Sequence, residues 1–186
     1  MSCVNRSGFI VRILRKDSTK AAGIGFVIGE RQVVTCAHVI NTALGFDQQS
    51  QQRPGPDVRL QIDFPIVRLV EDSPSRRCQV AAWQPPTGTQ DPYGDVAVLA
   101  IVDEALPASA GPARLADAET FRDAKAAVFG YPADENRPNG IWAELRLSSA
   151  VGGGILQSTP ATNPRYAPSL ALAGLPSLSL TVMEMP

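Results

Sequence analysis

The 186-residue chain lacks the features that mark membrane-spanning and nucleic-acid-binding proteins. No stretch approaches the ~20 consecutive apolar residues that a transmembrane helix requires. Its 17 Lys and Arg residues stand against 18 Asp and Glu residues, a formal net charge of −1. There is therefore no excess of positive charge to attract nucleic acid or an anionic membrane surface. We expect neither nucleic acid nor a membrane among the partners.

Cysteine is scarce as well. Cys3, Cys36 and Cys78 are odd in number and far apart, which is more typical of reduced thiols than of a disulfide framework. A zinc site that uses Cys36 and His38 is conceivable, but no Cys-x-x-Cys pair accompanies them, so we expect no metal and no cofactor. Residues 1–16 contain no apolar run closed by a small-residue cleavage site, and they do not predict a signal peptide. These observations favour a cytoplasmic protein.

Long amphipathic helical patterns are also missing, and short apolar runs separated by turn residues take their place. Residues 58–64 alternate apolar and polar side chains, the period of a half-buried strand. Gly29-Glu30-Arg31 is typical of a hairpin turn, and short helices are conceivable at residues 37–44 and 117–127. Such a pattern favours an antiparallel barrel or sandwich. The predicted strands are residues 9–14, 25–28, 32–35, 58–64, 79–83, 96–101 and 126–131.

Two polar residues border apolar strands and are candidates for chemistry. His38, the only histidine, follows an apolar strand, where its imidazole can act as a general base on a rigid backbone. Asp95 directly precedes an apolar strand, where a buried carboxylate needs a partner such as an imidazole Nδ1–H. Taken singly, each is more often a structural histidine or a turn residue. A barrel in which the two never meet therefore stays an alternative.

The flanking motifs point to a known family. They are Gly23-Ile24-Gly25-Phe26-Val27, Thr35-Cys36-Ala37-His38, Gly94-Asp95-Val96-Ala97-Val98-Leu99 and Ala126-Ala127-Val128-Phe129-Gly130-Tyr131-Pro132. Together they resemble the trypsin-like (chymotrypsin-fold) serine peptidases, and most closely an intracellular, disulfide-free bacterial branch. The resemblance implies an all-β, trypsin-like double β-barrel that hydrolyses peptide or protein substrates through an acyl-enzyme. It makes His38 the general base and Asp95 the carboxylate that orients it.

The family's nucleophile loop, of the Gly-x-Ser-Gly type, is not found in the sequence. Its glycines let backbone N–H groups converge on the substrate carbonyl oxygen. Gly152-Gly153-Gly154 has no serine beside it and is typical of a flexible turn. Ser169 and Ser177 lie at suitable distances from Asp95 along the chain, but each stands between a proline and a leucine. They are weak candidates, and we expect peptide hydrolysis at background rate.

Composition changes after residue 157, since residues 158–186 contain only two charged side chains. We expect a peptidase domain at residues 1–157, with a complete first barrel at about 8–101 and an incomplete second barrel at 110–157. The remaining residues would form an atypical tail that is disordered or read out of frame, as in a truncated or frameshifted copy. The alternative is a pseudoprotease that binds a peptide or partner protein without cutting it.

Overall fold

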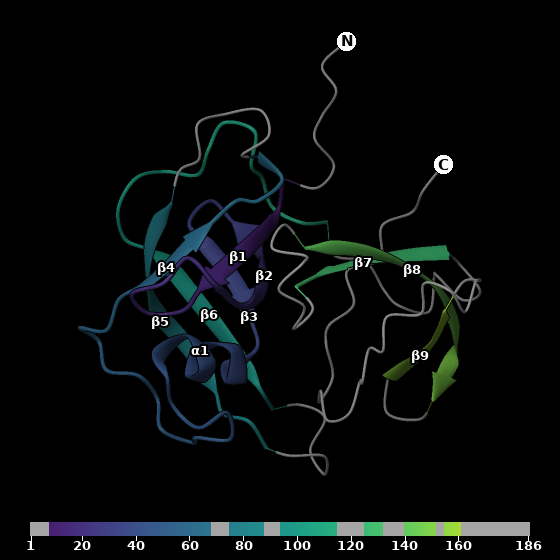
Figure 1. Ribbon diagram of the computed structural model, residues 1–186, viewed down its shortest axis with the longest axis horizontal. Coiled ribbons are helices and arrows are strands. Elements are labelled where there is room, and N and C mark those ends of the chain that lie inside the picture. Colours follow the sequence, from purple (N-terminus) through teal and green to yellow (C-terminus); the bar gives the residue numbers. More distant parts are fainter. Residues whose placement is uncertain are drawn as a thin grey trace. The chain divides into compact units, whose positions relative to one another are not determined.

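The computed structural model describes residues 8–67, 75–87, 94–114, 125–131, 140–151 and 155–160. The chain divides into two compact units, Met1–Ala113 and Arg114–Pro186 (Figure 1). Within the described ranges, no helix is both long enough and apolar enough to cross a membrane.

The first unit is a closed antiparallel barrel. Its strands follow one another around the barrel in the order β1-β2-β3-β6-β5-β4, and β1 also pairs with β4, which closes the ring. A two-residue turn, Glu30-Arg31, joins β2 to β3, because Gly29 pairs with Gln32. The hairpin prediction at this point is confirmed. The strands are β1 (Ile10–Leu14), β2 (Ala21–Gly29), β3 (Gln32–Thr35), β4 (Leu60–Asp63), β5 (Arg76–Gln84) and β6 (Val96–Ile101).

The barrel closes because alternate side chains of its strands are apolar and point inward. In β6, Ala97, Leu99 and Ile101 are buried while the residues between them are more exposed. Inward-facing side chains from every strand meet in one cluster, which supplies most of the driving force for folding. Its fully buried members include Val11, Ile13, Val27, Val33, Ile62, Phe64, Cys78 and Leu99.

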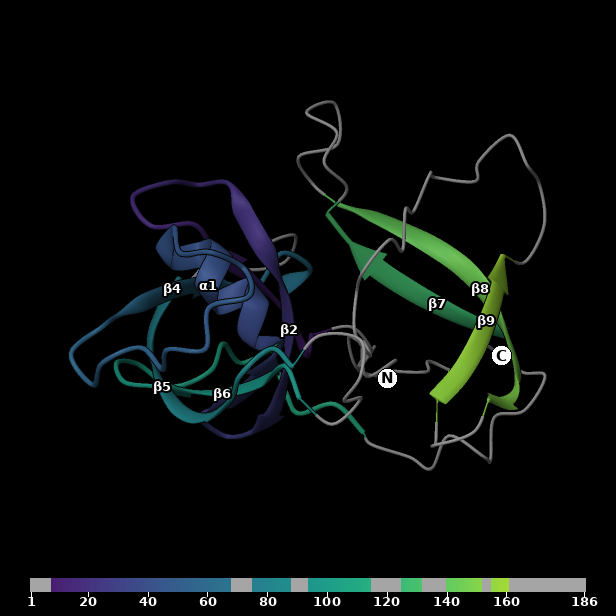
Figure 2. The same ribbon diagram turned by 90° about the horizontal axis from the view of Figure 1, so that it is seen from below.

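One helix, α1 (Ala37–Leu44), follows β3 and contacts β1, β2 and β6 of the barrel (Figure 2). It buries Ala37, Val39, Ile40 and Ala43, and the predicted helix at 37–44 is confirmed. Gly45 ends it in the left-handed conformation, at φ 77°. The N–H groups of Gly45 and Phe46 donate to the carbonyls of Thr42 and Asn41, the Schellman arrangement that satisfies the last turn of a helix.

The second unit contains an antiparallel sheet in the order β7-β8-β9. Its strands are β7 (Lys125–Gly130), β8 (Ile141–Val151) and β9 (Ile155–Pro160). Phe129 is buried and packs against the rings of Tyr131 and Trp142, with ring centroids 5.4 Å and 5.2 Å apart. The all-β expectation of one complete barrel followed by a smaller second sheet is thus confirmed.

Several predictions for the second unit need correction. The strand predicted at residues 126–131 is confirmed as β7, so the short helix that was conceivable over residues 117–127 is wrong at residues 125–127, while residues 117–124 lie outside the described ranges. Strands β8 and β9 were not predicted. β9 spans residue 157, and its pairing with β8 continues to Pro160; the boundary after residue 157 stays a prediction. Residues 161–186 lie outside the description.

Candidate active site

The barrel register brings the two candidate residues to the same end of neighbouring strands. Thr35, the last residue of β3, pairs with Ala97, the second residue of β6. Because the strands are antiparallel, the chain leaving β3 passes beside the chain entering β6. His38 comes three residues after Thr35, in the first turn of α1, and Asp95 stands just before β6. Two segments 57 residues apart are therefore adjacent.

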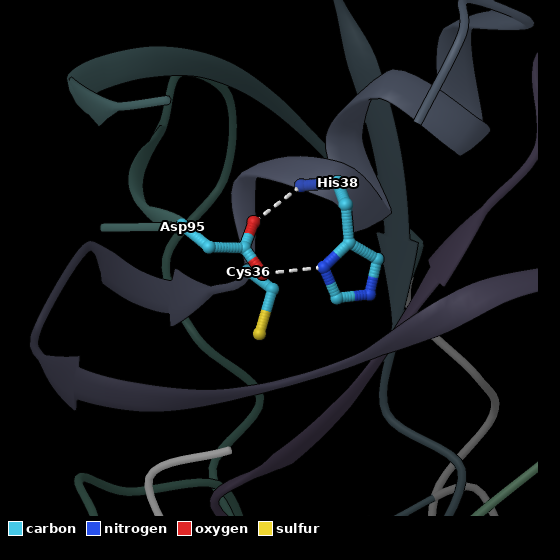
Figure 3. A group of neighbouring side chains, drawn as sticks. All are labelled: Cys36, His38 and Asp95. Atoms are coloured by element: carbon cyan, nitrogen blue, oxygen red, sulfur yellow. Dashed lines mark hydrogen bonds and ion pairs between the residues drawn. The ribbon is translucent and has the colours of Figure 1, made fainter. Parts of the chain in front are cut away.

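His38 and Asp95 are bonded to each other twice. The imidazole Nδ1 lies 2.6 Å from Asp95 Oδ2, and the backbone N–H of His38 donates to Asp95 Oδ1 at 2.8 Å (Figure 3). The Asp95 side chain is only 1% exposed, whereas the His38 side chain is 15% exposed. A buried carboxylate needs such donors. The predicted contact between these residues is present, and the alternative in which they never meet is wrong.

This contact assigns the imidazole proton. A carboxylate only accepts, so Nδ1 must carry the hydrogen. In a neutral imidazole with this tautomer, the second nitrogen, Nε2, has a free lone pair that can take a proton from another group. The pair thus has the arrangement of a general base held in one tautomer by a carboxylate.

The backbone of Asp95 is held in an uncommon conformation. Its φ of 63° lies in the left-handed region, which few residues other than glycine adopt. The Asp95 N–H donates to the carbonyl of Pro85 at 2.8 Å, and its carbonyl accepts from the N–H of Ala37 at 3.3 Å. The preceding Gly94 leaves no room for a side chain, because a Cβ there would lie 2.0 Å from Thr87 Oγ1. The Gly94-Asp95 sequence therefore has a steric reason.

Cys36 is a third polar group beside the pair, and the sequence indicated it only as a conceivable zinc ligand with His38 (Figure 3). Burial, and secondarily the charge of Asp95, raises the pKa of its thiol from 9.0 to about 12. The thiol therefore stays protonated at neutral pH, and a protonated thiol is neither a nucleophile nor a metal ligand. The position of Cys36, two residues before His38, is the only sequence signal for its placement.

A cation site at this cluster is the competing interpretation. Cys36, His38 and Asp95 offer ligand atoms that all lie within 4.8 Å of one another. However, Nδ1 of His38 lies 2.6 Å from Asp95 Oδ2, so a cation held by these two atoms would have to replace this hydrogen bond. The chemistry of the three groups favours the hydrogen-bonded pair.

The candidate nucleophiles are not among the residues that the structure describes. Ser169 and Ser177 lie beyond Pro160, and Gly152-Gly153-Gly154 falls between β8 and β9, outside the described ranges. The structure therefore brings together the proposed base and its carboxylate, and it does not test the serines.

Comparisons with known proteins agree with this geometry. A family model described as the trypsin-like peptidase domain matches residues 23–170, more than half of the chain. No curated protein matches the sequence. Among solved structures, the chain is similar to neuropsin, a serine protease expressed in the limbic system of mouse brain. The TM-score is 0.51 and the identity 15%, over 86% of this chain and 73% of that one.

A second similar structure is kallikrein-related peptidase 10, with a TM-score of 0.51 and 13% identity. The match covers 80% of this chain and 61% of the kallikrein chain. At these identities the structures support the fold alone, and the family match supplies the membership. On the sequence match and the shared fold together, the chain belongs to the trypsin-like peptidase domain family.

Proposed function

We propose that these residues form a serine-endopeptidase-type domain in which His38 is the general base and Asp95 orients it. The observation that carries the proposal is the 2.6 Å contact between His38 Nδ1 and Asp95 Oδ2, with the imidazole partly exposed and the carboxylate buried. Membership of the trypsin-like peptidase family supports it. The substrate class is peptides or proteins.

The pair would act in the usual order of acyl transfer. Nε2 takes the proton of a serine hydroxyl as its oxygen attacks the peptide carbonyl, and the imidazolium that forms is stabilised by Asp95. The same proton then passes to the leaving amine as the C–N bond breaks, which leaves an acyl-enzyme. Water, deprotonated by the same imidazole, cleaves the acyl-enzyme and regenerates the serine.

The nucleophile is the missing part. No serine of the sequence stands in a Gly-x-Ser-Gly loop, and Ser169 and Ser177 each have a leucine where the loop needs glycine. Without an activated serine, the base has no proton to abstract. We therefore propose that the 186 residues on their own hydrolyse peptides at background rate.

A fluorophosphonate probe tests this proposal directly, because it labels serines that a neighbouring base has activated. We expect no labelling above that of the His38→Ala variant, which serves as the matched control. Labelling of Ser169 or Ser177 that disappears in His38→Ala would identify a working nucleophile and overturn the proposed inactivity.

A module that binds without cutting is the second candidate, favoured by an intact base–carboxylate pair in a sequence with no recognisable nucleophile loop. Peptide or partner affinity that is the same in His38→Ala as in the unmodified chain would support it.

We further propose a reducing, cytoplasmic setting and kinship with the disulfide-free bacterial branch. The free thiols of Cys36 and Cys78 support both.

A further inference from the structure

Asn41 is a polar residue in a helix that otherwise buries apolar side chains. It is completely buried, one turn after His38 on α1. Its Nδ2 donates to the backbone carbonyls of Gln48 and Ser50, each at 3.0 Å. Its Oδ1 is buried with no hydrogen-bond partner among the described residues, which is costly. The two bonds of Nδ2 attach the loop after the helix to α1.

That loop, residues 46–52, reaches from α1 to the segment that precedes Asp95. We call it the bridging loop. The side chain of Gln51 donates through Nε2 to the carbonyls of Gln49, at 3.0 Å, and of Pro86. Pro86 is fully buried, so this carbonyl has a fixed position. The bridging loop is thus bound to α1 at one end and to Pro86 at the other.

Pro86 is next to the residue that holds the Asp95 backbone. The carbonyl of Pro85 accepts the N–H of Asp95 at 2.8 Å, and Asp95 in turn binds His38 through both carboxylate oxygens. These contacts form a closed circuit. Hydrogen bonds join α1 to the bridging loop and the bridging loop to Pro86, and the peptide bond joins Pro86 to Pro85. Hydrogen bonds then join Pro85 to Asp95, and Asp95 back to α1.

We propose that Asn41 and Gln51 are positioning residues that hold the Asp95–His38 pair in register from outside the site. The inference rests on the proposed function for its purpose, and on the hydrogen-bond circuit for its physics. Asp95 occupies a sparsely populated backbone conformation, and such residues persist only where the surroundings fix them. A general base must be held within a fraction of an ångström of its productive position. Asn41 and Gln51 supply this restraint without a hydrogen bond of their own to the imidazole.

The single histidine makes the proposal measurable without any enzymatic activity. In protein with ¹⁵N-labelled imidazole, the Nδ1 proton of His38 gives one NMR signal, and its hydrogen exchange reports opening of the contact with Asp95. We expect Asn41→Ala to raise the exchange rate of the Nδ1 proton about tenfold more than it raises the exchange rates of the amide protons in the β3–β6 ladder. Gln51→Ala should raise the Nδ1 rate a few-fold more than the ladder rates. The matched control is Gln52→Ala, whose exposed side chain makes no hydrogen bond within the described ranges; it should change nothing.

The comparison with ladder amides separates positioning from general stability. If Asn41→Ala and Gln51→Ala accelerate the Nδ1 proton and the ladder amides equally, the two residues only stabilise the barrel, and the inference is wrong. If Asn41→Ala does not fold, Gln51→Ala still provides the test. Gln51 is exposed, so its substitution leaves no cavity in the barrel. If the unmodified chain shows no Nδ1 signal, the His38–Asp95 pair does not form in solution, and the proposed function fails first. A signal that is present but indifferent to both substitutions defeats the inference alone.

Discussion

The two units of the chain differ in how completely their strands are paired and their apolar side chains buried. In the first unit, every barrel strand pairs with a neighbour on both sides, and one cluster of apolar side chains fills the interior. In the second unit, the described strands form an open order of three, and Trp142 on β8 is 44% exposed. Both members of the proposed catalytic pair, with the hydrogen bonds described above, belong to the first unit. The closed-barrel unit therefore contains both the proposed general base and its carboxylate.

The largest expected effect follows from separating the units. We expect a fragment of residues 1–114 to unfold cooperatively in urea, because it keeps the barrel and the bond from Ala113 N–H to the carbonyl of Val27. A fragment of residues 115–186 should show no cooperative transition, since Phe129 is the one buried apolar residue among those described in its three-stranded sheet, and a small sheet with so little core is marginal in water. The chain has two tryptophans, Trp83 in the first unit and Trp142 in the second, so fluorescence follows each fragment separately. A cooperative transition in the second fragment would remove the contrast between the units.

The same contrast explains which elements could be predicted from the sequence. The barrel strands were found because apolar and polar residues alternate or form short apolar runs bounded by turn residues. β8 carries a similar alternation, in which Ala143, Leu145 and Leu147 are separated by Glu144 and Arg146, and this signal was available but not used. β7 was predicted as a strand at residues 126–131, although a short helix over residues 117–127 was also conceivable. Pairing with β8, a contact that local propensity does not register, decides its first residues.

At the site, sequence motifs were enough to find His38 and Asp95, because each borders an apolar strand and each lies in a motif of the family. Cys36 was considered only as a metal ligand, since burial beside Asp95 is a property of the folded barrel. The role of Pro85 and the bridging loop could not be predicted either. Their contacts with Asp95 and Pro86 join segments that are distant in sequence and have no recognisable motif.

Thiol reactivity tests how tightly the barrel protects its interior. All three cysteines belong to the first unit, and burial raises the pKa of both Cys36 and Cys78 from 9.0 to about 12. At pH 8 the thiolate fraction of each is then about a thousandfold lower than that of a free thiol, and alkylation slows accordingly. Iodoacetamide labelling mapped by mass spectrometry measures this, with the chain unfolded in urea as the control. Alkylation of Cys36 in the folded protein at the rate of the unfolded one would show that the site is open to water.

The effect of the Asp95 charge on the Cys36 thiol can be measured in the same experiment. Asp95 is the second cause of the raised thiol pKa of Cys36, after burial. Asp95→Asn should therefore accelerate the alkylation of Cys36 modestly, and that of Cys78 not at all, because the charged neighbour of Cys78 is Asp103. Equal acceleration of both thiols would mean that the substitution unfolds the barrel and does not act through charge.

Paired aromatic substitutions compare the cores of the two units. Phe64 is fully buried in the barrel cluster, and Phe64→Ala should lower the free energy of unfolding by about 4 kcal/mol, since a large cavity remains. Trp142→Ala, at an exposed position, should cost less than about 1 kcal/mol. Trp142→Phe is the background for the first measurement, because Trp83 emission then reports the barrel alone. Similar losses for Phe64→Ala and Trp142→Ala would contradict the difference in packing.

The last comparison concerns two ion pairs of the first unit. Arg12 on β1 donates through both Nε and Nη2 to Asp63 on β4, across the pair of strands that closes the barrel, and both side chains are nearly buried. Asp63→Ala removes an ion pair and two hydrogen bonds from the largely buried guanidinium of Arg12, and we expect a loss of about 3 kcal/mol in urea unfolding. The control is Arg77→Ala, which breaks a 3.5 Å pair with Asp103 at a side chain that is 71% exposed; its loss should stay below about 1 kcal/mol.

Salt separates the two further, because ions screen exposed charges and have little access to buried ones. Raising the salt concentration should remove the effect of Arg77→Ala and leave that of Asp63→Ala. If Asp63→Ala costs as little as its control, the ion pair contributes nothing to closing the barrel between β1 and β4. Backbone pairing and apolar packing would then hold these two strands together without it.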